Sequence, residues 1–275
     1  MVEVAWARLK AHELRARVAA GAAVILPLGA TEQHGPHLPV MTDCRIGEEI
    51  AHRAAAKAAA AGRDVLVAPM LWAGLSEHHM VFGGTFTLQP ETFQAMIADL
   101  VGSLARLGVR DVLLSNSHGG NIRAMHAAAE TAAQRLGIAI VATTYAAEAA
   151  DEIAALLEDQ PSLMHAEEAE TSMMLALEPD LVDTGDLASL ADGMTAEKGR
   201  GALSAGKASF RWRPFQHVTA NGVRGNPARA TAEKGERMLE VSADALAALL
   251  LDPALWAPAT DLRGAGTGGV PFVEG

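Results

Sequence analysis

Residues 22–43 read AAVILPLGATEQHGPHLPVMTD, and this stretch decides how the chain folds. Its first seven residues are apolar and predict a buried strand. The loop that follows places Glu32, His34, His37 and Asp43 among glycines and prolines. Carboxylates and imidazoles on a rigid loop after a core strand suit one or two divalent cations, with Zn²⁺, Mn²⁺ or Fe²⁺ as candidates. An ordinary solvated loop is the weaker alternative, because four potential ligands fall within twelve positions.

Apolar runs alternate with helical patterns along the first half of the chain. Strands are predicted at 24–28, 64–69, 111–115 and 138–143, and helices between them at 46–61, 90–107 and 122–136. Further helices are predicted at 4–19, 146–158, 165–177 and 226–251, and a polar loop is predicted at 180–207. The alternation of strands and helices indicates an α/β fold, built of parallel βαβ units with helices on both faces of the sheet.

Three polar, glycine-rich segments each follow a predicted strand, and they carry Glu32, His79 and His118. Because ligands bind outside the carboxyl ends of parallel strands, we expect these segments to converge. His118 in SNSHGGN then adds a metal ligand, and Asp43 could bridge two cations with its two oxygens. Glu170 falls on the apolar face of a predicted helix, where an unpaired carboxylate is costly. A second cation would give Glu170 a partner.

Other polar residues suggest roles around the metals. His165 could give a proton to a leaving amine with Glu168 orienting it, or both could be ordinary residues of a helix start. We expect His37 to hydrogen-bond a carbonyl or carboxylate behind the ligands rather than bind metal. His79 could contact substrate, with the backbone N–H of Gly84 facing an oxyanion, although structural roles are equally compatible.

The composition excludes several function classes. The 275 residues are 50% hydrophobic, which is enough for one domain at 1–275, with a core at about 5–250 and a loose tail at about 252–275. A net charge of −11 without long basic runs argues against nucleic acid and anionic membrane as partners. No apolar run is long enough for a transmembrane helix. The single cysteine, Cys44, is interpreted as a packing residue and fits a cytoplasmic location.

Four motifs occur in the order and spacing of the creatininase family: LPLGATEQHGPHLPVMTD, SNSHGGN, HAEEAETS and GVRGNPARATAEKG. The chain resembles that family from about residue 5 to 245. The resemblance implies a three-layer α/β/α sandwich with a mostly parallel central sheet, a two-metal centre and hydrolysis of C–N bonds in non-peptide amides. It also implies a homo-oligomer, with a hexamer as the candidate form.

The resemblance also assigns residues. It implies Glu32, His34, Asp43 and His118 as metal ligands, and His165 as the proton-transfer group. The pattern of strands and loops selects the same four metal ligands. His165 is selected separately, because it lies near Glu170 in the sequence.

Several positions depart from the family member that opens creatinine. That member carries a second-metal Glu two residues after its last His, where this chain has Gly120, so Glu170 is expected to supply the missing carboxylate. His78 stands where the family usually has an acidic residue, and Gly83 stands where it usually has Pro. The two Trp lid residues have no clear counterpart, and only Tyr145 lies near their expected place. These departures favour a substrate other than creatinine.

Together these features predict a metal-dependent amidohydrolase acting on a small cyclic amide, lactam or formamide. Two divalent cations per subunit, Zn²⁺ or Mn²⁺ with Fe²⁺ as a further candidate, would share Asp43 and a hydroxide that attacks the carbonyl carbon. His165, with Glu168 behind it, would protonate the departing nitrogen. One alternative is a single-metal formamide deformylase of the same family, and another is a non-catalytic metal-binding assembly protein. The expected substrate contacts are His79, Gly84 and Tyr145, and no role is assigned to His78 or His217.

Overall fold

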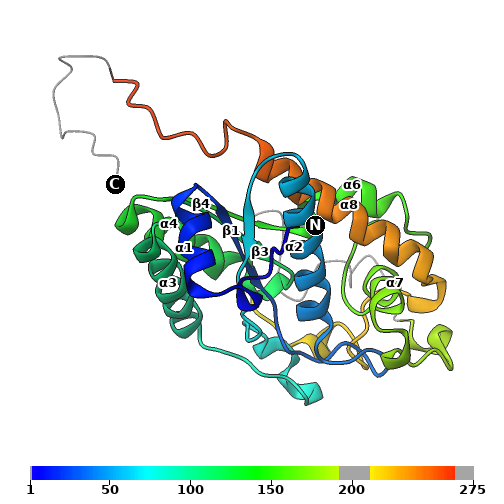
Figure 1. Ribbon diagram of the computed structural model, residues 1–275. Coiled ribbons are helices and arrows are strands. Elements are labelled where there is room, and N and C mark those ends of the chain that lie inside the picture. The colour runs from blue at the N-terminus through cyan, green and yellow to red at the C-terminus, as the bar shows by residue number, and fades with distance from the viewer. Residues whose placement is uncertain (1, 192–210, 264–275) are drawn as a thin grey trace.

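A parallel sheet of four strands forms the centre of the protein (Figure 1). The computed structural model describes residues 2–191 and 211–263. The strands are β1 (Ala23–Leu28), β2 (Val65–Val67), β3 (Asp111–Asn116) and β4 (Ala139–Thr144), and they lie side by side in the order β2-β1-β3-β4. All three pairings are parallel. The four strands predicted from apolar runs are confirmed.

Helices cover both faces of this sheet. One layer holds α1 (Ala11–Ala19), α3 (Pro90–Leu107) and α4 (Ile122–Leu136). The other holds α2 (Thr42–Ala60), α5 (Tyr145–Glu148), α6 (Ala150–Ala154), α7 (Glu168–Leu177) and α8 (Ala232–Leu251). Figure 1 shows α1, α3 and α4 on one side of the strands and α2, α7 and α8 on the other. The predicted α/β/α fold is confirmed.

Side chains of each strand alternate between the two layers, because successive residues of a strand point to opposite faces. Val24 and Leu26 pack into the core under α3 and α4. Ile25, from the same strand, packs into the core under α2, α7 and α8, together with Leu113 of β3. Strands covered on both sides are apolar throughout, which is why β1 gives a strong signal in the sequence.

Several helices begin or divide at positions other than the predicted ones. The predicted helix at 4–19 starts only at Ala11, because Ala5 forms a bridge with Val67 beside the sheet. The helix predicted from 46 starts at Thr42, which places Asp43 in its first turn. The helix predicted at 146–158 is divided into α5 and α6, and the one predicted from 165 begins at Glu168.

Two predicted irregular regions are described in part. Residues 180–191 of the predicted loop at 180–207 contain only short 3₁₀ turns, and the remainder lies outside the described residues. Of the predicted tail at 252–275, residues 252–263 contain no helix or strand, and the rest is likewise outside. Among the helices that the structure describes, none combines the length and apolarity that crossing a bilayer requires.

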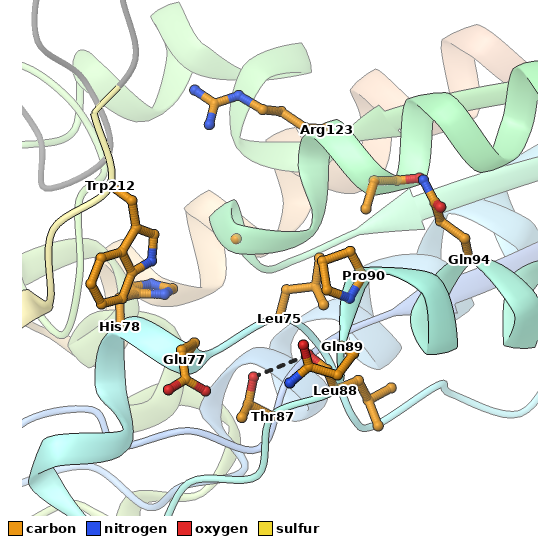
Figure 2. Close-up of a pocket in the computed structure, with 12 residues that line it drawn as sticks. Leu75, Glu77, His78, Thr87, Leu88, Gln89, Pro90, Gln94, Arg123 and Trp212 are labelled. Carbon is orange, nitrogen blue, oxygen red and sulfur yellow. Dashed lines mark hydrogen bonds between the residues drawn. The ribbon is translucent and has the colours of Figure 1, made fainter.

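The loops after β1, β2 and β3 meet at the carboxyl edge of the sheet. The backbone N–H of Gly29 donates to Leu71 O, and that of Ser117 donates to Leu28 O, both at 2.9 Å. Beside this junction lies a pocket between the starts of α3 and α4, with His78 and Gly120 in its lining (Figure 2). The predicted convergence of the three segments is therefore present.

Candidate metal centre

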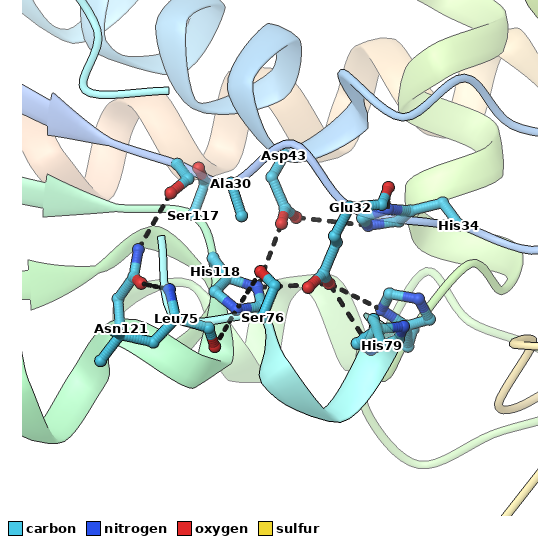
Figure 3. Close-up of polar contacts among 12 residues, drawn as sticks. Ala30, Glu32, His34, Asp43, Leu75, Ser76, His79, Ser117, His118 and Asn121 are labelled. Atoms are coloured by element: carbon cyan, nitrogen blue, oxygen red, sulfur yellow. Dashed lines mark hydrogen bonds and ion pairs between the residues drawn. The ribbon is translucent and has the colours of Figure 1, made fainter. Parts of the chain in front are cut away.

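His118 faces two carboxylates at the end of β3. Its Nδ1 lies 3.3 Å from Oε1 of Glu32 and 3.1 Å from Oδ2 of Asp43 (Figure 3). Its Nε2 lies 3.2 Å from the carbonyl oxygen of Leu75. A carbonyl can only accept, so Nε2 carries the proton and the Nδ1 of a neutral ring presents a lone pair to the carboxylates. Acceptor atoms this close require a proton or a metal cation between them.

His34 repeats this arrangement on the other side of Asp43. Its Nδ1 donates to the backbone oxygen of Glu32 at 3.0 Å, which leaves Nε2 to face Oδ1 of Asp43 at 3.3 Å. The same Nε2 lies 3.6 Å from Oε2 of Glu170. Figure 3 shows Asp43 between His118 and His34. The two oxygens of Asp43 therefore face two different imidazoles.

Glu170 reaches this place from the first turn of α7. It is buried, and its Oε2 accepts the backbone N–H of Ala166 at 2.5 Å. Ala166 has a φ of +51°, a left-handed conformation that is costly for a residue with a side chain. The turn before α7 is thus held in a strained shape that points a backbone donor at Glu170.

The donor set fits divalent cations. Among the described residues, the buried atoms Oε2 of Glu32, Nε2 of His34 and Oδ2 of Asp43 have no hydrogen-bond partner, whereas buried polar atoms normally have one. His34, Asp43 and Glu170 place ligand atoms within 4.8 Å of one another, and Glu32 and His118 do so together with His78. Imidazole nitrogens with carboxylate oxygens suit Zn²⁺, Mn²⁺ or Fe²⁺.

The burial of several carboxylates at the centre shifts the pKa values of the residues there. Burial by itself would lower the pKa of His34, but the charges of Asp43 and Glu170 outweigh it and raise the pKa to about 10. Burial likewise opposes charge on His118, and Glu32 and Asp43 together hold its pKa well above the usual range. Burial raises the pKa of Glu170 to about 7. Positive charge is therefore strongly favoured here, as protons or as metal ions.

His165 and His79 lie against the Glu32 side of the centre. Nδ1 of His165 and Nε2 of His79 each lie 3.6 Å from Oε1 of Glu32, and the two rings are 4.3 Å apart. Nε2 of His165 donates to the backbone oxygen of Gln33 at 3.0 Å. Burial lowers the pKa of His165 well below its usual value, and that of His79 to about 3. Both rings are neutral at pH 7.

Glu168 does not lie behind His165, so its predicted role is wrong. His165 precedes α7, and the carboxylate of Glu168 turns toward α8. Oε1 accepts from Nζ of Lys234 at 2.6 Å, and Oε2 accepts the backbone N–H of Glu158 at 3.1 Å. Glu168 is fully buried, so this ion pair ties α7 to α8.

His37 and Tyr145 also differ from expectation. His37 lies behind the ligands as predicted, but its Nε2 contacts the hydroxyl of Thr171 at 2.9 Å rather than a carbonyl or carboxylate. Tyr145 is no lid residue, because it is buried in the core under α2, α7 and α8. Burial and then the charge of Glu170 raise its pKa well above the ordinary value. Gly84, the other predicted substrate contact, is exposed in a loop and has a φ of +67°.

Two residues that the sequence left without a role belong to the site. His78 is buried with its ring 5.7 Å from that of His118 and nearly parallel to it, at 16°. Phe215 lies over the imidazoles, with ring centroids 4.3 Å from His79 and 5.2 Å from His165. His78 could have been suspected from its adjacency to His79, but no local pattern marks Phe215. His217, two residues later, is exposed.

Comparisons with known proteins identify similar sequences and a similar fold. The family model Creatininase, described as creatinine amidohydrolase, matches residues 7–250. The mycofactocin precursor peptide peptidase of Mycolicibacterium smegmatis is 32% identical over 216 residues, which cover 78% of each chain. A crystal structure of creatinine amidohydrolase is similar with a TM-score of 0.76 and 28% identity, covering 94% of this chain and 100% of that one. Similar solved structures also include a Mn creatininase and a mutant of Zn-Zn type.

Proposed function

The chain belongs to the creatininase family, and on that premise we propose that it is a metal-dependent amidohydrolase cleaving a C–N bond in a cyclic amide, lactam or formamide. One observation carries the proposal. The two oxygens of Asp43 face His118 on one side and His34 on the other, within 3.3 Å of each ring. A single carboxylate between two ligand sets is the arrangement that a pair of bridged cations needs.

Two cations would be held by sets that share Asp43. Glu32 and His118 would complete the first set, and His34 and Glu170 the second. Bound there, divalent cations lower the pKa of a water molecule and polarise a carbonyl oxygen. The unpartnered buried atoms of Glu32, His34 and Asp43 within the described part of the chain support this assignment, and the Mn and Zn-Zn forms of related creatininases support the choice of metal.

His165 is proposed to move the proton. Because Nε2 donates to the backbone of Gln33, the lone pair of Nδ1 points toward Oε1 of Glu32, at the edge of the proposed metal pair. A buried neutral imidazole can accept a proton there and pass it to the departing nitrogen. The rings of His79 and Phe215 pack against His165 and exclude water, which strengthens electrostatic interactions at the centre.

The test uses protein loaded with Zn²⁺ or Mn²⁺ and a panel of creatinine, cyclic ureides and formamides. Chelation is expected to abolish activity, and Asp43→Ala to lose both cations in elemental analysis. His165→Ala should retain the cations and lose turnover, whereas His217→Ala, at an exposed site, should retain both. Stoichiometric cation binding without hydrolysis of any amide in the panel would refute the proposal.

Metal counting also separates the two-cation enzyme from a single-cation deformylase. The single-cation enzyme would bind one ion per chain, and Glu170→Gln would leave that number unchanged. A short peptide is the second candidate substrate, because the relative from Mycolicibacterium smegmatis is named as a peptidase of a precursor peptide. Adding short peptides to the panel tests this candidate directly.

A further inference from the structure

A pocket of about 500 Å³ lies directly beside the metal centre (Figure 2). Leu75, His78 and Gly120 belong to its lining. A Cβ built at Gly120 would lie 2.4 Å from Nε2 of His118, and the ring of His78 is nearly parallel to that of His118. Two residues of the pocket lining, His78 and Gly120, therefore lie next to His118, a proposed metal ligand. Its volume is within the range of about 300–1,000 Å³ that is typical of sites for small organic ligands.

Two aromatic residues from one segment connect the pocket with the proposed catalytic residues. Trp212 lines the pocket and is 49% exposed, so its indole ring is available to a ligand. Phe215, three residues later, is buried with its ring 5.9 Å from His78 and 5.2 Å from His165. Figure 2 shows the indole of Trp212 next to His78, with Pro90 on the other side of the pocket.

The chemistry of the lining favours an uncharged group. Glu77 and Arg123 are the charged residues among those that line the pocket within the described chain, and their charges are opposite. Leu75, Leu88 and Pro90 add apolar surface. Aromatic rings pack well against an indole face and gain about 0.5–1.5 kcal/mol beyond the burial of their area. A single small heterocycle would leave much of this pocket filled with water.

We propose that this pocket binds a substituent of the substrate amide, and that Trp212 forms a wall that selects an uncharged aromatic or branched apolar group. The inference rests on the proposed hydrolytic function of the adjacent metal centre. It assigns the substrate class as amides that carry a bulky apolar group, rather than small unsubstituted rings. The scissile bond would lie beneath Phe215 near His165, with the substituent extending past His78 toward Trp212.

Binding can be measured without turnover. Benzamide titrated into the metal-free protein should change the tryptophan fluorescence, because one of the four tryptophans lines the pocket. Trp212→Phe should remove that change. Trp72→Phe should retain it, because Trp72 is similarly exposed, at 53%, but lies outside the pocket lining. No change in the wild-type protein, or the same change in Trp212→Phe, would overturn the proposal.

Selectivity gives a second readout, as the ratio of kcat/KM for formanilide to kcat/KM for formamide. We expect the ratio to fall about tenfold or more in Trp212→Ala, the effect of losing apolar contacts in a specificity pocket. Gln94→Trp, which fills the pocket from α3, should lower it as well, whereas Gln134→Trp on the exposed face of α4 should not. An unchanged ratio in both pocket variants would refute the assignment of the wall.

The two proposals fail in different ways. If no amide is hydrolysed but benzamide still changes the fluorescence of Trp212, the pocket assignment stands and the proposed function is wrong. If amides are hydrolysed and the pocket variants leave the selectivity ratio unchanged, the function stands and the pocket assignment is wrong.

Discussion

Gly120→Ala is expected to disturb the centre although it adds a single methyl group. Gly120 lies in the 3₁₀ turn Gly119–Asn121 after β3. A Cβ there would lie 2.3 Å from the carbonyl oxygen of Leu75 and 2.4 Å from Nε2 of His118. The same two atoms form the 3.2 Å hydrogen bond that orients His118. The methyl group can be accommodated only if these two partners move apart.

The size of the effect follows from these contacts. Losing a buried hydrogen bond costs about 1–3 kcal/mol, and overpacking adds about 1–3 kcal/mol, so the expected loss of unfolding free energy is about 2–6 kcal/mol. Gly119→Ala is the matched control, because a Cβ at Gly119 meets no atom of the described chain within 4 Å. Neither glycine has a positive φ, so the backbone tolerates alanine at both positions. Replacing glycine with alanine restricts the unfolded chain in both variants, so this small contribution to the unfolding free energy cancels in the comparison.

Urea unfolding of the metal-free proteins measures this difference, and competition with a chelator measures cation affinity. Losing the hydrogen bond that orients a ligand commonly weakens metal affinity about 10–100-fold. We expect that loss in Gly120→Ala and wild-type affinity in Gly119→Ala. Equal unfolding free energies and equal affinities in the two variants would refute the close approach of Leu75 and His118 to Gly120.

Three further predictions concern the surrounding charges. Glu170→Gln should lose about one cation per chain in elemental analysis, whereas Glu167→Gln should lose none, because burial raises the pKa of Glu167 to about 8 and keeps it protonated at pH 7. Lys234→Met should cost about 3–5 kcal/mol in urea unfolding, because it leaves the buried Glu168 unpaired, and adding Glu168→Gln should recover most of that loss. Cation affinity measured with an indicator should rise between pH 6 and 8, because His34, with a pKa of about 10, must lose its proton to bind; a constant affinity would contradict this.

Much of the fold could be predicted because the strands are buried on both faces. Such strands appear as continuous apolar runs, and the parallel topology then places their carboxyl ends together. Glu32 and His118 could therefore be brought to one site without a template. Helix starts were less predictable: α2 begins at Thr42, and α7 begins at Glu168, where the side chain of Glu167 caps the helix by accepting the backbone N–H of Ala169.

The errors at the site concern partners that are distant in sequence. Glu168 was expected to orient His165 from three residues away, but its partner is Lys234, 66 residues later on α8. Phe215 likewise reaches His165 from another part of the chain. Spacing along one helix cannot reveal such contacts, because they depend on how α7, α8 and the loops pack together.

The glycine at position 120 and the carboxylate of Glu170 have one structural explanation. The carbonyl of Leu75 approaches position 120 so closely that any side chain there meets it, so a carboxylate for the second set of ligands has to come from elsewhere. Glu170 supplies one from α7, held by the backbone of Ala166. Introducing Gly120→Glu alone should therefore displace His118 instead of adding a ligand, and chelator competition should show weaker cation binding than in the wild type. Tighter binding would show that the loop carrying Leu75 can move aside. Position 120 could then supply the carboxylate itself, and its geometry would not explain the use of Glu170.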